Sequence, residues 1–273
     1  MCIHGAGPGA SGWSNFKGNV DAFAQQYRTI LFDMPQFGKS DKPVIKDQRL
    51  TFLADVLDAF MAAMGIEKAH FIGNSMGGQA ALKLAVDHPS RVDKVVVIGS
   101  GVIKAGSIFQ PMPLEGIRNI ANYYKEGGPS IAKMRQLLES LVSNKSLITD
   151  DLVQERFEAS NDPELIALAK HGAPGTEDLY FDLLKVKAKT LVVWGQDDRA
   201  GARSMSGCSC CAALPMRACI SFRAAVIGRT WNTATSSIIW CSIFSERVMS
   251  AIKPSMASML RFSSAPSALS ERP

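Results

Sequence analysis

The segment Gly73-Asn74-Ser75-Met76-Gly77 constrains this chain more than any other feature. It has the pattern Gly-x-Ser-x-Gly and lies between an apolar run that predicts a strand, Ala69–Ile72, and a pattern that predicts a helix, Gln79–Asp87. Such a context holds the serine on a sharp turn, where larger flanking side chains would clash, and points the next N–H at a developing oxyanion. The sequence therefore predicts that Ser75 is a nucleophile and that Met76 donates to the oxyanion. An ordinary turn is the alternative, because short motifs also occur by chance.

The first 198 residues alternate between predicted strands and helices. The expected strands are Met1–Ile3, Thr29–Phe32, Ala69–Ile72, Val92–Ile98 and Thr190–Trp194, and the expected helices are Trp13–Gln25, Leu50–Met64 and Gln79–Asp87. Strands that are apolar throughout and alternate with helices predict an α/β fold with a mostly parallel sheet and helices on both faces.

A long helical stretch interrupts this alternation and suggests how the chain is divided. Residues 107–175 are mostly helical in pattern, which favours an inserted helical cap over an active site. The expected division is a core at 1–106, the cap at 107–175 and the end of the core at 176–199. The remaining residues, 200–273, give no clear fold.

Two further segments fit the chemistry of Ser75. The glycine-rich loop His4–Gly9 follows the first strand, and the N–H of Ala6 is the expected second oxyanion donor. Asp198 lies just past the strand Thr190–Trp194, where the chain order Ser…Asp…His requires an acid. Its neighbour Asp197 fits the spacing equally well. The alternative for both is a pair of solvated loop carboxylates.

Composition excludes several other functions. Apolar residues make up 47% of the chain and charged residues 20%, which fits a globule with a sizeable core. The apolar runs are shorter than a membrane span, and no leader pattern precedes the first motif, so a cytoplasmic protein is expected. Residues 1–198 carry 21 basic and 23 acidic residues, whereas residues 199–273 carry nine and two. The net charge of +5 therefore reflects the tail, and no nucleic-acid partner is expected.

Four segments of the chain form a combined signature. They are His4–Asn15 (HGAGPGASGWSN), Gly73–Gly78 (GNSMGG), Ser146–Thr149 (SLIT) with Arg156–Glu158 (RFE), and Trp194–Arg199 (WGQDDR). Together they resemble the meta-cleavage product hydrolases of the α/β-hydrolase fold. Enzymes of this family cleave a carbon–carbon bond in 2-hydroxy-6-oxo-hexa-2,4-dienoates, the ring-fission products of aromatic catabolism.

The resemblance assigns roles to single residues and leaves some properties open. It implies a triad containing Ser75 and Asp198, an oxyanion hole from Ala6 and Met76, and contacts of Asn15, Asn74 and Arg156 with the carboxylate and the 2-oxo group. A planar guanidinium matches a carboxylate; an exposed helix arginine is the alternative for Arg156. The implied partner is a small dienoate, without metal or organic cofactor. The 6-substituent and self-association stay open.

The catalytic histidine of the family pattern is missing. The histidines are His4, His70, His88 and His171, and none of them follows Asp198. His4 belongs to the oxyanion loop, His70 begins a strand, His88 ends a helix and His171 lies in the cap. A structural role is expected for each of them. Loss of a triad base lowers turnover by about 10⁶-fold, so the chain as written is expected to be impaired.

The tail explains this loss if its reading frame is shifted after Arg199. Back-translated and shifted by one base, Cys208–Ile220 becomes compatible with a final strand of the family, and Arg223–Arg229 with a segment containing Gly-His-Trp. The gene is then expected to encode Gly-His-Trp in the neighbouring frame across Val226 and Ile227. The fold is expected to be incomplete at both ends, because the loop begins at residue 4 and the tail should not supply the missing sheet strand.

The tail cysteines and the function class each leave an alternative. The cysteines at 208, 210, 211 and 219 lack the paired C-x-x-C spacing of a zinc site, so no metal is expected. The expected function is carbon–carbon bond hydrolysis of a dienoate. The alternatives are an esterase of the same fold and a non-catalytic protein of this fold that binds a ligand.

Overall fold

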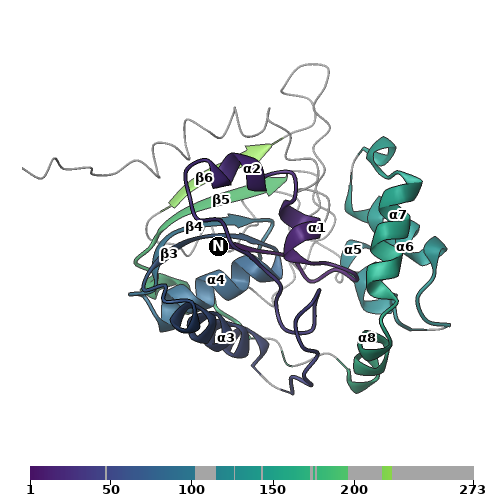
Figure 1. Ribbon diagram of the computed structural model, residues 1–273, viewed down its shortest axis with the longest axis horizontal. Coiled ribbons are helices and arrows are strands. Elements are labelled where there is room, and N and C mark those ends of the chain that lie inside the picture. Colours follow the sequence, from purple (N-terminus) through teal and green to yellow (C-terminus); the bar gives the residue numbers. More distant parts are fainter. Residues whose placement is uncertain are drawn as a thin grey trace, which may run out of the picture.

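The computed structural model describes residues 1–46, 48–101, 115–125, 127–142, 144–172, 175, 177–195 and 217–222. They form one six-stranded sheet with helices on both faces (Figure 1). The strands are β1 (Cys2–Ile3), β2 (Leu31–Phe32), β3 (Ala69–Asn74), β4 (Val92–Ile98), β5 (Lys189–Gly195) and β6 (Arg217–Phe222). The helices are α1 (Gly12–Phe16), α2 (Val20–Ala24), α3 (Arg49–Ala63), α4 (Met76–Asp87), α5 (Glu115–Asn122), α6 (Ile131–Leu141), α7 (Asp150–Ser160) and α8 (Pro163–Leu168). Short 3₁₀ turns cover Lys145–Leu147, Ala169–His171 and Asp182–Lys185. No helix in these ranges is long and apolar enough to cross a membrane.

The strand order places a switch in connection direction beside Ser75. The order is β2-β1-β3-β4-β5-β6, and every neighbouring pair is parallel. The chain passes from β1 to one side, into β2, and returns to the other side of β1, into β3. In parallel sheets, ligands bind at the carboxyl ends of the strands where this reversal occurs. The loop after β1 and the turn after β3 meet at that point.

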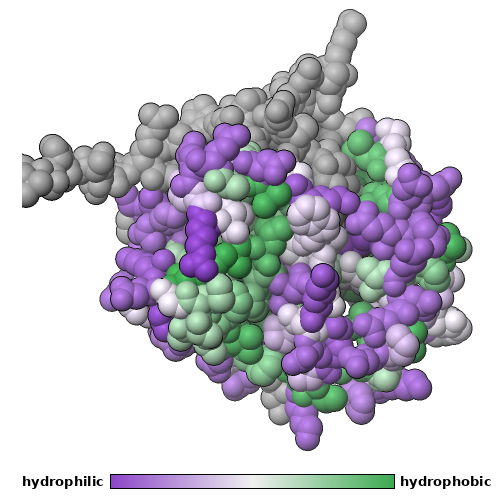
Figure 2. Space-filling model, viewed as in Figure 1, coloured by the Kyte–Doolittle hydropathy of each residue, from purple (hydrophilic) through white to green (hydrophobic). Residues whose placement is uncertain are grey.

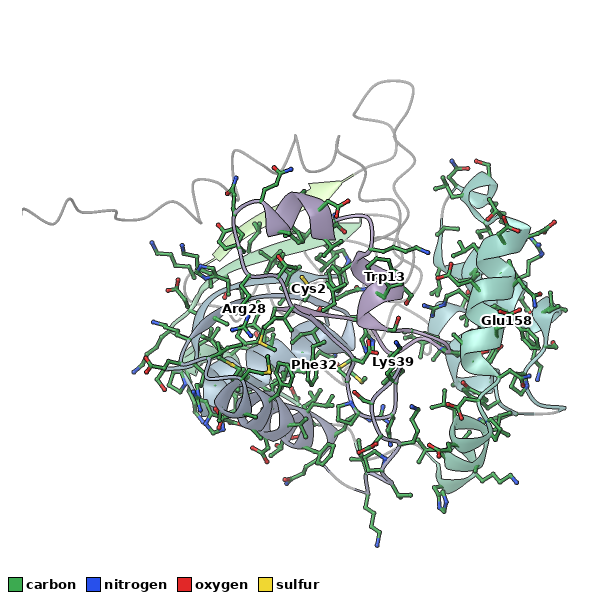
Figure 3. The ribbon with its side chains drawn as sticks, viewed as in Figure 1. Cys2, Trp13, Arg28, Phe32, Lys39 and Glu158 are labelled. Carbon is green, nitrogen blue, oxygen red and sulfur yellow. The ribbon has the colours of Figure 1, made fainter. Side chains whose placement is uncertain are left out.

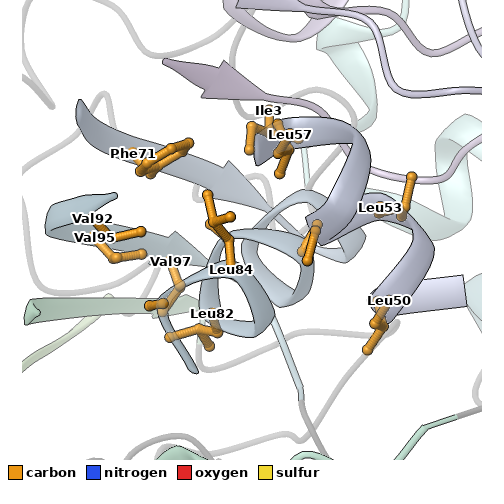
Figure 4. Close-up of a cluster of buried hydrophobic side chains, with 14 of the residues drawn as sticks. Ile3, Leu50, Leu53, Leu57, Phe71, Leu82, Leu84, Val92, Val95 and Val97 are labelled. Carbon is orange, nitrogen blue, oxygen red and sulfur yellow. The ribbon is translucent and has the colours of Figure 1, made fainter. Parts of the chain in front are cut away.

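One face of the sheet is covered by α3 and α4. The alternation along β4 sends Val95 and Val97 into this core, together with Phe71 of β3 (Figure 4). Leu53 and Leu57 of α3 and Leu82 and Leu84 of α4 fill the same cluster, as Figure 4 shows. Each fully buried side chain of this size contributes about 1.5–3 kcal/mol, so this core fixes the end of β3 from which Ser75 follows.

The opposite face packs on the first two helices and on part of the helical stretch. Val96 and Ile98 of β4 join Leu137 and Leu141 of α6 and Val153 of α7 in a second cluster. Helices α5 to α8 gather beyond the carboxyl ends of the strands (Figure 1). They therefore lie on the side of the sheet where the half-buried Ser75 lies.

Three expectations from sequence differ from the structure. The helix expected at Trp13–Gln25 is two short helices, α1 and α2, interrupted at 17–19, where Gly18 is a poor helix former. Strand β3 continues to Asn74 and helix α4 begins at Met76, so the turn at Ser75 is tighter than expected. The expectation that the tail supplies no sheet strand is wrong, because β6 pairs with β5 along six residues.

Candidate active site

Ser75 occupies a strained backbone conformation at the tip of the turn between β3 and α4. Its φ is 50° and its ψ is −118°, a region that non-glycine residues avoid. The Ser75 N–H donates to Ile98 O on the neighbouring strand at 2.8 Å. Such strain costs about 1–3 kcal/mol and persists where the surrounding structure enforces it. The turn therefore has the backbone shape that an exposed nucleophilic serine requires.

Glycines around Ser75 allow the backbone segments to approach closely. A Cβ at Gly73 would lie 2.4 Å from Gly78 Cα, and a Cβ at Gly77 would lie 2.3 Å from Ile3 O. Neither position can hold a side chain without moving the main chain. The turn thus packs directly against the end of β1, which places the first loop beside the serine.

The loop after β1 meets Ser75 on this side. A Cβ at Gly5 would lie 3.3 Å from both Ser75 Cβ and Asn74 Nδ2. Ala6 follows Gly5 and packs on the main core, and Met76 is 7% exposed at the start of α4. The two residues predicted to donate to an oxyanion therefore belong to the two segments that converge on Ser75.

Two buried asparagines connect these segments. Asn15 Oδ1 accepts from Gly5 N at 3.2 Å and from Asn74 Nδ2 at 3.0 Å. Both side chains are fully buried, and among the described residues Asn74 Oδ1 has no hydrogen-bond partner. A buried acceptor without a partner costs about 1–3 kcal/mol, so this oxygen favours a ligand that donates a hydrogen bond.

Arg156 brings a buried positive charge to the same network. Its Nη1 donates to Ser14 Oγ at 2.9 Å, and its Nη2 donates to Pro8 O at 2.6 Å. Burial lowers the pKa of Arg156 to about 10, so the guanidinium stays charged at neutral pH. Within the described chain it has no ion pair, and its buried Nε has no partner. The alternative of an exposed helix arginine is wrong, because Arg156 is 2% exposed.

Sequence reasoning missed Ser14 and Arg49. Ser14 Oγ also accepts from Asn15 Nδ2 at 3.3 Å, so it joins Arg156 to the asparagines. Ser14 lies inside the segment His4–Asn15 that carries the family resemblance, and this position could have indicated its role. Arg49 Nη1 lies 3.9 Å from Met76 Sδ, and burial lowers the pKa of Arg49. Nothing in the local sequence pattern indicates that Arg49 reaches Met76.

His4 is a structural histidine. Its Nε2 accepts from Met34 N at 3.0 Å, so Nδ1 carries the proton and donates to Gly5 O at 2.8 Å. Burial is the main cause that lowers the pKa of His4 to about 4, with the charge of Arg156 adding to it. Both ring nitrogens are therefore engaged in a neutral ring that supports the first loop.

The other histidines lie away from Ser75. His70 is five residues earlier on β3, about 16 Å along the strand, and its Nδ1 lies 3.2 Å from Asp93 Oδ2. His88 follows the far end of α4, about 20 Å along the helix from Ser75. His171 is exposed in a 3₁₀ turn. Asp197, Asp198 and the cysteines at 208, 210 and 211 lie outside the described residues.

Two hollows flank the sheet and differ in character. An apolar hollow of about 640 Å³ lies at the amino ends of β1 and β3, lined by residues such as Cys2, Ile30 and Phe71. Apolar residues gather around it on the face seen in Figure 2. It is large, but the strained turn at Ser75 does not line it. A second groove runs between the glycine-rich loop and α7, with Trp13 and Lys39 on one side and Glu158 on the other (Figure 3).

Comparison with known proteins gives consistent matches. The alpha/beta hydrolase fold model matches residues 1–222. A 2-hydroxy-6-oxo-6-phenylhexa-2,4-dienoate hydrolase from Burkholderia cepacia is 44% identical over 205 residues, which cover 73% of this chain and 71% of that protein. A 2-hydroxy-6-oxononadienedioate/2-hydroxy-6-oxononatrienedioate hydrolase from Comamonas testosteroni is 41% identical with the same coverage.

A solved structure agrees with these matches. The meta-cleavage product hydrolase from Pseudomonas fluorescens IP01, as a mutant complexed with acetates, superposes with a TM-score of 0.76 at 25% identity. The alignment covers 94% of this chain and 89% of that one. A parallel sheet with this strand order, a strained serine after β3 and these relatives lead to one conclusion: the chain belongs to the alpha/beta hydrolase fold family and, within it, to the meta-cleavage product hydrolases.

Proposed function

We propose that this site binds a 2-hydroxy-6-oxo-hexa-2,4-dienoate and is built to cleave its C5–C6 bond with water. The observation that carries the proposal is the buried guanidinium of Arg156, which has no carboxylate partner among the described residues. It is joined through Ser14 and Asn15 to Asn74 beside Ser75. A carboxylate on Arg156 gains charge-assisted hydrogen bonds from a guanidinium that is only 2% exposed. The substrates named for the relatives carry such a carboxylate.

The reaction fits the order of groups along this network. With the carboxylate on Arg156, the 2-oxygen lies toward Asn15 and Asn74, and the C6 carbonyl toward Ser75, Ala6 and Met76. The proton of the 2-hydroxyl first moves to C5. Water, or Ser75 followed by water, then adds to C6, and the negative charge on the C6 oxygen is stabilised by backbone N–H groups. The C5–C6 bond breaks, and its electron pair returns to the 2-oxygen, which leaves a carboxylic acid and a 2-hydroxypenta-2,4-dienoate.

A base for this chemistry is the missing part. Asp198 is the proposed acid of the triad, and the proposed origin of the loss is a one-base frameshift after Arg199. The sequence matches to the curated relatives cover 73% of the chain, and this supports a change in sequence character in the tail. Reading the gene tests the frameshift, and the absence of Gly-His-Trp in the neighbouring frame contradicts it.

The test of function uses the yellow substrate 2-hydroxy-6-oxo-6-phenylhexa-2,4-dienoate. Calorimetry is expected to show binding to the full chain, while the absorbance of the substrate decays about 10⁶-fold more slowly than with a complete triad. Restoring the reading frame should recover turnover, and Ser75→Ala in the restored protein should remove it. Absence of binding by both proteins contradicts the proposed function.

A ligand-binding protein without turnover is the second candidate. It is favoured by one observation, that the described histidines are engaged elsewhere or lie far from Ser75. Rapid decay of the substrate with the unaltered chain contradicts this candidate. An esterase is distinguished by the carboxylate: Arg156→Met should leave hydrolysis of a neutral ester unchanged while weakening binding of the dienoate.

A further inference from the structure

Two tyrosines hold the last turn of α7. Tyr123 Oη lies 2.6 Å from Ser160 Oγ, and Tyr124 Oη donates to Ser160 O at 3.1 Å. Because Ser160 Oγ uses its own proton to bond Phe157 O at 2.7 Å, Tyr123 is the donor in the first bond. The two rings stack edge to face at 5.0 Å. Ser160 thus receives a hydrogen bond from each tyrosine.

The first loop contacts the same turn of α7. A Cβ at Gly9 would lie 2.4 Å from Arg156 O and 3.2 Å from Ser160 N. These two atoms belong to residues four positions apart, in the last turn of the helix. Gly9, with a φ of 67°, therefore packs directly on the backbone from which the Arg156 side chain starts. The turn is fixed by the loop and by the tyrosines together.

The aim of the Arg156 guanidinium depends on this turn. Its two hydrogen bonds go to neutral oxygens, Pro8 O and Ser14 Oγ, and among the described residues no carboxylate fixes it. A planar guanidinium binds a carboxylate well only when its N–H groups are held in line with both oxygens. Burial raises the pKa of both tyrosines, so their hydroxyls remain donors at neutral pH.

We propose that Tyr123 and Tyr124 are positioning residues for anion recognition, because their hydrogen bonds to Ser160 fix the turn of α7 that aims Arg156 at the carboxylate of the ligand. The inference rests on the proposed function of Arg156. It goes further because it assigns part of the affinity for a carboxylate to the hydroxyls of Tyr123 and Tyr124. These hydroxyls do not touch the ligand and act only through the position of Arg156.

The test compares the Tyr123→Phe/Tyr124→Phe variant with the unaltered full chain. The probes are 2-hydroxy-6-oxo-6-phenylhexa-2,4-dienoate and its methyl ester, with dissociation constants from calorimetry. Loss of two hydrogen bonds to Ser160 should raise the Kd of the carboxylate about tenfold. The Kd of the ester should stay within about twofold, because a neutral ester gains little from the aim of a guanidinium. Tyr27→Phe, which removes a hydroxyl elsewhere, is the matched control and should leave both values unchanged.

A double-mutant cycle separates positioning from support of the fold. In an Arg156→Met background, removal of both hydroxyls should have no further effect on the carboxylate. Equal losses for acid and ester, no loss for either, or an additive effect in that background would each overturn the proposal. Single variants Tyr123→Phe and Tyr124→Phe decide the question if the double variant unfolds. If Arg156→Met alone leaves the carboxylate affinity unchanged, the proposed function of Arg156 itself fails, which is a distinct result.

Discussion

Arg91 and Arg156 lie at opposite ends of the sheet and differ in their partners: Arg91 has a carboxylate partner, and among the described residues Arg156 has none. Arg91, at the amino end of β4, places Nε 2.5 Å from Asp58 Oδ1 and donates from Nη1 to Ile66 O. Arg156, beyond the carboxyl ends, bonds neutral oxygens and leaves its Nε without a partner among the described residues. A paired guanidinium holds elements together, whereas an unpaired buried one costs stability unless a ligand completes it. The difference separates a structural end of the sheet from a binding end.

Steric substitution should show the largest contrast between the two ends. Gly77→Ala places a methyl group 2.3 Å from Ile3 O, and we expect it to lower the free energy of unfolding by about 3 kcal/mol or more. Gly65 lies near the amino ends of the strands, and a Cβ there would meet open space. Only its φ of 65° disfavours Gly65→Ala, so we expect the free energy of unfolding to fall by about 1 kcal/mol. Urea unfolding measures both. Equal losses would contradict the close packing of the Ser75 turn.

Acid should lower the stability of the fold through protonation of His4, which supports the loop beside Ser75. The pKa of His4 is about 4 in the fold and 6.5 in its ordinary state, so between these pH values the unfolded chain binds the extra proton. The free energy of unfolding should therefore fall by up to about 3 kcal/mol as pH drops from 6.5 to 4. His4→Gln should flatten this part of the profile, whereas His70→Gln should retain most of it. An unchanged slope in His4→Gln contradicts the assignment.

Removal of the unpaired guanidinium should affect binding more than stability. Arg156→Met should raise the Kd of a dienoate about 100-fold, because a charge-assisted, bidentate contact is lost. The free energy of unfolding should not decrease, since a buried charge without a counter-ion is removed. Calorimetry with substrate and urea unfolding measure the two effects. A large loss of stability would mean that Arg156 is structural, like Arg91.

The paired guanidinium should show the reverse result with a smaller effect. Arg91→Met leaves Asp58 without its partner at a partly exposed position, and we expect a loss of about 1–2 kcal/mol in the free energy of unfolding. The affinity for the dienoate should be unchanged. The double variant Asp58→Asn/Arg91→Met should recover part of the loss. Weaker dienoate binding in Arg91→Met would show that the two ends are coupled.

The sequence was sufficient for elements that depend on local pattern. Strand β4 has its expected bounds, Val92–Ile98, because a continuous apolar run between turn residues admits few other structures. The turn at Ser75 was also predicted correctly from sequence, because the glycines at 73 and 77 are required where the main chains of neighbouring segments are in contact. The break between α1 and α2 was not located, because the apolar pattern hid a single poor helix former, Gly18. The pairing of β6 was not predicted either, because tertiary contacts override weak local strand preferences.

The sequence predicted which residues belong to the candidate site, but it did not predict the hydrogen bonds that join them. Ser14 joins Arg156 to Asn15 across 142 positions of sequence, and Tyr123 reaches Ser160 across 37. Such bonds depend on which segments the fold brings together, and no periodicity encodes them. The roles of the site residues stay predictions, and the experiments above test two of them, Ser75 and Arg156. The others are Asp198, Ala6, Asn15, Asn74 and Met76.

The packing of Gly9 on the end of α7 has a consequence for the order in which the protein matures. During synthesis, the glycine-rich loop and the serine turn leave the ribosome early, yet the positive charge of the site arrives some 80 residues after Ser75. Until α7 docks, the nascent chain can shape its serine turn but has no Arg156 with which to hold an anionic ligand. Such a ligand present during synthesis would favour the docked form over the open one.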